Sequence, residues 1–171
     1  HMLTLASGVP PTEFTWSQRD KDGKVVSTDK YTPLSFYNKL WGYDLNNDYV
    51  LVMNDPSREY YKVYQIEYDR HTYDGHDWVY LNLPNEEVKP MLIASLKDST
   101  AMYISCDVNK FLNRQKGVMD LKNFDYESLL GVTMTMDKKE RIITHASASS
   151  HAMTLIAVDI DKATSKPTKW M

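Results

Sequence analysis

Alternation of apolar and polar residues marks the first predicted element of the chain. Phe14 and Trp16 alternate with polar neighbours, and Val25 and Val26 begin a second stretch after a Lys-Asp-Gly sequence. A period of two is typical of strands, and Gly23 can adopt the positive φ that a tight turn requires. The pattern therefore predicts a β-hairpin over residues 12–32.

A helical period follows directly after this hairpin. Leu34, Tyr37 and Trp41 recur at the spacing of one helix face, which predicts that this face is buried. Thr32, with a proline after it, is suited to the start of a helix, and a glycine stands where the helix should end. We expect a short helix within residues 31–42.

The rest of the chain mixes both periods irregularly. A longer helix is expected over residues 85–99, with Val88, Leu92, Ser95 and Leu96 on its buried stripe. A shorter helix is expected near residues 125–132. Strands are expected over residues 48–55, 60–68, 78–84, 100–108, 140–146, 151–160 and 168–171. Strands and helices interleaved in this way are typical of an α+β domain.

Composition narrows the class of protein. Of the 171 residues, 42% are hydrophobic and 25% are charged, which is typical of a single packed domain. The formal net charge of −3 gives no reason to expect nucleic acid or an anionic membrane as a partner, and no apolar run is long enough to span a bilayer. The opening His-Met is typical of a cloning scar, so residues 1–2 are left out of the reasoning about the fold.

The cysteine content excludes internal disulfides and metal sites built from several cysteines. Cys106 is the single cysteine, so the chain has no internal disulfide framework and no metal site built from several cysteines. It lies within an apolar run, where a small buried side chain is the common interpretation, although a histidine-activated nucleophile is the alternative. One unpaired thiol suits a reducing compartment.

Histidines supply the other candidate chemistry. His151 follows a Ser-Ala-Ser-Ser sequence and opens an apolar strand. It could be a catalytic base, a metal ligand or a structural residue, and the pattern alone favours the structural interpretation because no partner is evident. A second group, within residues 71–77, offers His71, Asp74, His76 and Asp77 as ligands for a divalent ion, but such loops are usually only solvated.

Several sequence strings together resemble one known family. These are the Pro-Pro-Thr-Glu-Phe-Thr-Trp segment from Pro10, the Ser-His-Ala-Met-Thr-Leu-Ile-Ala-Val-Asp segment from Ser150, and the Pro-Thr-Lys-Trp segment from Pro167. In this order and at these distances they resemble the bleomycin hydrolase and aminopeptidase C family of papain-like cysteine peptidases. The similarity extends over nearly the whole chain.

This resemblance implies a papain-like α+β fold, in which one half carries the cysteine nucleophile and a β-rich half carries the histidine. His151 matches the family's catalytic histidine, with Ser150 in place of the usual threonine. The resemblance also implies peptide substrates, a cytoplasmic location and a homo-oligomer, namely a hexameric ring. It implies neither a cofactor nor a metal.

The same resemblance leaves two catalytic positions unmatched. Gln18, Gln65 and Gln115 have no cysteine after them, and Cys106 matches a non-catalytic position of the family. The family's catalytic asparagine belongs to a segment that would follow Trp170. Residues 1–171 are therefore expected to form a single partial domain, with residues 3–171 as the middle to C-terminal part of an aminopeptidase that is inactive alone. A natural non-catalytic module for assembly or ligand binding is the alternative.

Overall fold

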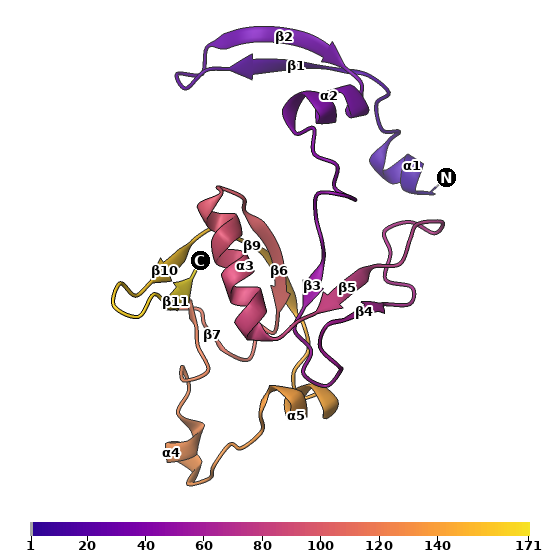
Figure 1. Ribbon diagram of the computed structural model, residues 1–171. Coiled ribbons are helices and arrows are strands. Elements are labelled where there is room, and N and C mark those ends of the chain that lie inside the picture. The colour runs from indigo at the N-terminus through magenta and orange to yellow at the C-terminus, as the bar shows by residue number, and fades with distance from the viewer. Residues whose placement is uncertain (1) are drawn as a thin grey trace. The chain divides into compact units, whose positions relative to one another are not determined.

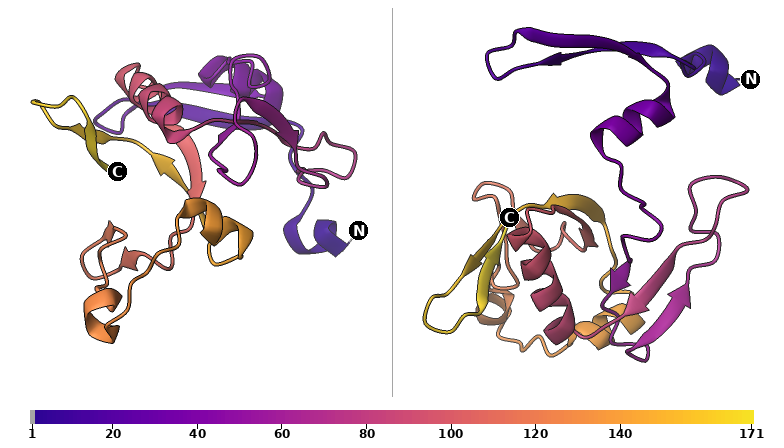
Figure 2. Two further views of the ribbon diagram at one scale, coloured as in Figure 1. Left: turned by 60° about the horizontal axis from the view of Figure 1, so that its bottom comes forward. Right: turned by 45° about the horizontal axis from the view of Figure 1, so that its top comes forward.

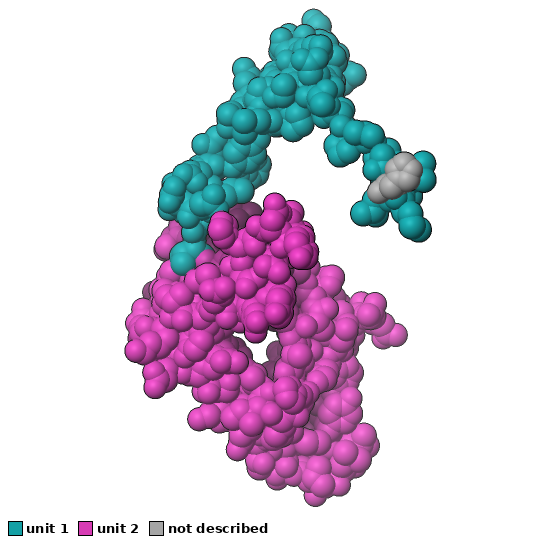
Figure 3. Space-filling view, turned by 90° about the vertical axis from the view of Figure 1, so that its right-hand side faces the viewer, with its two compact units in different colours: residues 1–50 teal, residues 51–171 magenta. Residues whose placement is uncertain are grey.

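The computed structural model describes residues 2–171 of the chain. These residues belong to two compact units, residues 1–50 and residues 51–171, which are coloured separately in Figure 3. Within residues 2–171, no helix combines the length and the apolar character needed to cross a membrane.

The first unit is built around a hairpin. It contains α1 (Met2–Ser7), β1 (Phe14–Arg19), β2 (Val25–Tyr31) and α2 (Pro33–Leu40). β1 and β2 pair antiparallel with Phe14 opposite Tyr31, and the register shifts between Gln18 and Arg19. Gly23 has a φ of 82°, as a tight turn requires, so the predicted hairpin is confirmed.

Helix α2 begins where the sequence predicts, but it buries a different face. Thr32 forms a capping box with Ser35, and this fixes the start of the helix. Phe36 packs edge-on against Phe14, with the ring centroids 5.1 Å apart. Tyr37 is half-buried, but Leu34 and Trp41 are 69% and 62% exposed, so the prediction of a buried face is wrong for these two residues. The aromatic face of the hairpin contacts Phe36 instead. Periodicity alone does not predict which face of the helix packs against the hairpin.

The second unit contains several small sheets and three helices. β3 (Val52–Met53), β5 (Val79–Asn82) and β4 (Lys62–Gln65) form a sheet in that order, with β3 parallel and β4 antiparallel to β5. The pairs β6–β9, β7–β8 and β10–β11 are antiparallel. Their bounds are β6 (Met102–Cys106), β7 (Leu112–Asn113), β8 (Val118–Met119), β9 (His151–Leu155), β10 (Val158–Ile160) and β11 (Pro167–Trp170). Figure 2 shows the β10–β11 ribbon from two sides.

Helix α3 (Asn85–Lys97) confirms its predicted stripe. Val88, Leu92, Ser95 and Leu96 are half-buried, and the helix contacts β6 (Figure 1). Pro84 precedes the first turn without a side-chain cap, and two glutamates occupy that turn, where the partial positive charge of the helix end favours them. The predicted short helix near residues 125–132 is confirmed as α4 (Tyr126–Leu130), which ends at a left-handed glycine.

Three predicted strands differ from the structure. The strand expected over residues 48–55 is present only as the short β3 (Val52–Met53). Residues 140–146 were expected to form a strand, but α5 (Lys138–Ile143) occupies most of this segment. Asp137 and Glu140 form a capping box that starts the helix, and this local signal prevails over the β-branched pair at its end. The strand expected over residues 151–160 is interrupted, because the N–H groups of Ile156 and Ala157 donate to the carbonyl of Met171.

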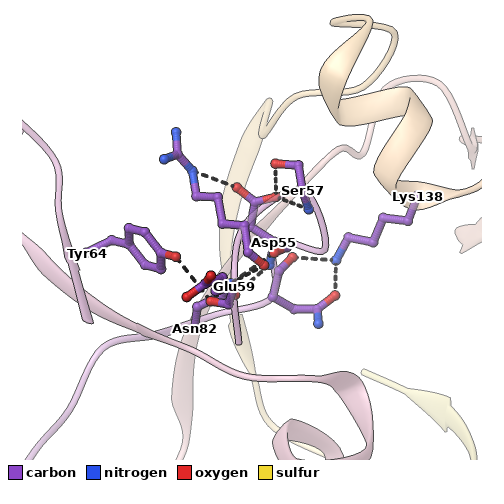
Figure 4. Close-up of polar contacts among 8 residues, drawn as sticks. Asp55, Ser57, Glu59, Tyr64, Asn82 and Lys138 are labelled. Carbon is purple, nitrogen blue, oxygen red and sulfur yellow. Dashed lines mark hydrogen bonds and ion pairs between the residues drawn. The ribbon is translucent and has the colours of Figure 1, made fainter. Parts of the chain in front are cut away.

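A buried amide holds one turn of the second unit in place. Asn82 is fully buried at the end of β5. Its Oδ1 accepts from the Asp55 N–H at 2.8 Å, and its Nδ2 donates to the carbonyls of Asp55 at 2.9 Å and Glu59 at 3.1 Å. Figure 4 shows these contacts together. Leu83, Val108 and Leu155 are the buried hydrophobic residues of the described chain.

Candidate functional site

The pairing of β6 with β9 places the candidate catalytic histidine. His151 is the first residue of β9 and lies directly opposite Cys106, the last residue of β6. Side chains of directly opposite residues project from the same face of an antiparallel pair. The His151 side chain is exposed, and Cys106 is half-buried. The imidazole of His151 is therefore held on a strand and remains accessible.

Residues 146–150, here called the approach segment, lead into His151 and carry a set of hydroxyl contacts. Ser147 Oγ donates to Asp107 Oδ2 at 2.7 Å. The Val108 N–H donates to Ser150 Oγ at 3.0 Å, and the Ser150 N–H donates to the Cys106 carbonyl at 3.0 Å. The approach segment is thus bonded to the chain that continues from β6.

Residues 107–110, here called the anchor loop, and the end of β6 supply further contacts to the same segment. The hydroxyls of Ser105 and Ser149 are hydrogen-bonded, and Lys110 Nζ donates to the Ala146 carbonyl. None of these partners was identified from the sequence, because about 40 residues separate the two segments. The register of β6 and β9 brings them together.

Cys106 lies beside His151 but has the chemistry of a structural thiol. Burial raises the pKa of the Cys106 thiol, and the neighbouring Asp107 carboxylate raises it further, while the Lys138 ammonium acts in the opposite direction. A nucleophilic cysteine needs the reverse, because only the thiolate attacks a carbonyl. The environment of Cys106 therefore favours the protonated form and supports a packing role.

Lys138 connects the start of α5 to the turn that Asn82 holds. Its Nζ donates to the Asn54 carbonyl at 2.8 Å. Partial desolvation lowers the pKa of Lys138, although the Asp55 carboxylate acts to raise it. For Asp55 itself, burial acts to raise the pKa, but hydrogen bonds from Ser57 and the charge of Arg58 prevail and lower it. Figure 4 shows Lys138, Asp55 and Ser57 in this group.

The loop of residues 71–77 does not gather its possible ligands. His71 packs edge-on against Trp78, with the ring centroids 4.9 Å apart. Asp77 accepts from Gln65 Nε2 at 3.1 Å and lies 3.8 Å from the Arg70 guanidinium. Among residues 2–171, no three histidine, cysteine, aspartate or glutamate side chains come together in a way that could hold a metal ion.

His145 occupies a turn rather than a strand. Its φ is 57°, and its N–H donates to the Ile142 carbonyl at 3.1 Å, directly after α5. The side chain is exposed, and it belongs to a reversal of the chain that ends the helix. Of the two histidines in this region, only His151 lies on the β6–β9 pair.

Comparison with known proteins defines the class to which this fold and site belong. Residues 1–171 match the Peptidase C1-like family along the whole chain, so the chain belongs to this family. Its fold is the papain-like α+β fold: the solved structure of PepW from Lactobacillus rhamnosis HN001 matches 99% of the chain with a TM-score of 0.90 and 32% identity. The fold class and the family resemblance predicted from the sequence are both confirmed.

Individual relatives make the relationship more specific. Aminopeptidase G of Lactobacillus delbrueckii subsp. lactis is 36% identical over 161 residues, which cover 94% of this chain and 37% of the relative. Human bleomycin hydrolase is 36% identical over 174 residues, which cover 99% of this chain and 38% of the relative. The chain therefore spans less than two-fifths of the length of these proteins and of PepW.

Proposed function

We propose that this chain is the histidine-bearing part of a cysteine aminopeptidase, with His151 as its general base. The observation that carries the proposal is the position of His151. Its exposed imidazole stands at the first residue of β9, within the Ser-His-Ala-Met sequence. The names of the relatives, aminopeptidases and bleomycin hydrolases, support peptide bonds near an amino terminus as the target.

The proposed reaction follows from the chemistry of a thiol beside an imidazole. The His151 imidazole takes the proton of a cysteine thiol, and the thiolate attacks the carbonyl carbon of the peptide. The C–N bond breaks as the imidazolium returns the proton to the leaving amine, and a thioester remains. Water, deprotonated by the same imidazole, then attacks the thioester and releases the acid and the thiol.

The proposal requires a nucleophile from polypeptide outside residues 1–171. Cys106 is the one thiol of the chain, and its environment raises the thiol pKa. An asparagine that orients the imidazole is likewise expected from outside the chain, as the family resemblance implies. Residues 1–171 alone should therefore not hydrolyse peptides, because a base without its nucleophile lacks the first step of the reaction.

Complementation tests this proposal directly. The chain is mixed with the remaining parts of the polypeptide, including the expected cysteine and asparagine segments, and release of an N-terminal amino acid from a chromogenic amide is measured. Activity that appears on mixing and disappears with His151→Ala supports the proposal. Equal activity of the His151→Ala mixture contradicts the role of His151. A source gene that encodes neither segment would instead favour the non-catalytic module.

We also propose that the complete protein is cytoplasmic and forms a hexameric ring, as the family resemblance implies. Exposed apolar side chains on the first unit, Leu34 and Trp41 among them, would favour association. Light scattering of the full-length polypeptide should give six times the mass of one subunit, and cell fractionation should place the protein in the cytoplasm. A monomer or a membrane-bound fraction would contradict these two expectations.

A further inference from the structure

The backbone on the N-terminal side of His151 is not part of a strand. β9 begins at His151, so its paired register with β6 extends only from this residue onward. The preceding approach segment is irregular. Two backbone bonds hold it, from the Ser147 N–H to the Arg141 carbonyl and from the Ser150 N–H to the Cys106 carbonyl, and side-chain contacts with the anchor loop supply the rest. Whatever fixes that segment also limits how far the His151 backbone can shift.

Asp107 is the centre of these contacts. Its side chain is only 11% exposed, and its Oδ2 accepts from Ser147 Oγ at 2.7 Å. The same oxygen lies 3.8 Å from Lys110 Nζ, and this ammonium also donates to the Ala146 carbonyl. Asp107, Lys110 and residues 146–147 therefore form a closed ring of polar contacts.

The burial of this carboxylate strengthens its hydrogen bond from Ser147, whereas Lys110, with its side chain 53% exposed, adds a weaker charge contact at 3.8 Å. Hydrogen bonds to an ionised acceptor are stronger than neutral ones, and shielding from solvent strengthens them further. Exposed ion pairs usually contribute little. Cys106 is the cross-strand partner of His151, and Asp107 is the next residue in the chain. The ring therefore begins one residue from this partner.

We propose that Asp107 and Ser147 are positioning residues for His151, an inference that rests on the proposed peptidase function. They act through the backbone of the approach segment, since neither side chain is hydrogen-bonded to the His151 imidazole and Ser147 belongs to that segment. A displacement of about 1 Å in a catalytic group can reduce a rate by about 100-fold. Losing this ring should therefore slow the chemical step while leaving substrate binding largely intact.

The test uses the full-length polypeptide that contains this chain. Ser147→Ala should lower kcat by about tenfold or more with KM nearly unchanged, because a misplaced base affects the transition state rather than the bound substrate. Ser147→Thr keeps the hydroxyl and should restore most of the rate. Asp107→Asn should lower kcat as well, because it replaces the charged acceptor of the Ser147 hydroxyl with a neutral one and removes the charge beside Lys110. Thr144→Val is the matched control, since the Thr144 hydroxyl contacts neither the approach segment nor the anchor loop: it donates to the Glu140 carbonyl at 2.8 Å and lies 3.8 Å from the Met136 sulfur.

The outcomes separate this inference from the proposed function. If His151→Ala keeps full activity, the role of His151 fails, whatever Ser147 does. If His151→Ala is inactive but Ser147→Ala and Asp107→Asn keep the normal kcat, the positioning role is overturned. It is equally overturned if Ser147→Thr loses as much rate as Ser147→Ala, or if Thr144→Val lowers kcat as strongly. Should Ser147→Ala fail to fold, the kcat of Asp107→Asn decides.

Discussion

Replacing Asn82 with alanine should destabilise the second unit by about 3 kcal/mol. Its amide makes three hydrogen bonds of 3.1 Å or shorter, to the Asp55 N–H and to the carbonyls of Asp55 and Glu59, and a fourth to Arg58 at 3.4 Å. Each good buried bond contributes about 1 kcal/mol net, and the bond at 3.4 Å adds little. The sum corresponds to roughly a hundredfold change in the ratio of folded to unfolded protein.

Urea denaturation measures this effect, with Asn109→Ala as the matched control. Asn109 is exposed, so its loss should shift the free energy of unfolding by less than about 0.5 kcal/mol. Amide exchange provides a second measurement, because the Asp55 N–H has the Asn82 side chain as its acceptor and should exchange faster in Asn82→Ala. Equal denaturation midpoints for the two variants would refute the assignment of Asn82 as the support of the turn.

Three further experiments test other parts of the structure. Asp137→Ala removes the cap of α5 and should cost about 1 kcal/mol in urea denaturation, whereas an equal loss in Lys139→Ala would contradict the capping role. Cys106 should react with iodoacetamide more slowly than free cysteine at neutral pH, because burial raises its thiol pKa; an equal rate would argue against this. The pKa of Asp55 is lowered, so its stabilising contribution is complete above the unfolded value of about 3.9 and is lost as the pH falls below it. Asp55→Asn should flatten the stability curve in that acidic range, and an unchanged curve would contradict the prediction.

Local signals were sufficient for the elements that begin with a cap or a turn. The hairpin needs only alternation and Gly23, and α2 begins at the Thr32 cap, so both are visible in a few consecutive residues. The same kind of signal was available for α5, where Asp137 and Glu140 form a capping box. The prediction of a strand there gave more weight to Ile142 and Ile143, whose β-branched side chains favour strands but do not exclude a helix.

In the candidate site, too, the residue marked by its sequence neighbours could be predicted, and the residues whose contacts are distant in the chain could not. His151 could be identified because its immediate neighbours form a family string. Asp107 and Ser147 could not, because their contact depends on the register of two strands that are far apart in the chain. The face of α2 that is buried also depends on a partner, the aromatic residues of the hairpin, which periodicity does not specify.

The register of β6 and β9 has a consequence for changes in chain length. Successive side chains of a strand point to opposite faces, so a slip of one residue would turn His151 to the other side of the pair. Inserting one residue between His151 and Met153 would therefore move the His151 side chain to the other face of the β6–β9 pair. A longer loop between α5 and the approach segment would leave that side chain on its present face. Insertions and deletions in homologous proteins should therefore occur before residue 146 and be absent from β9.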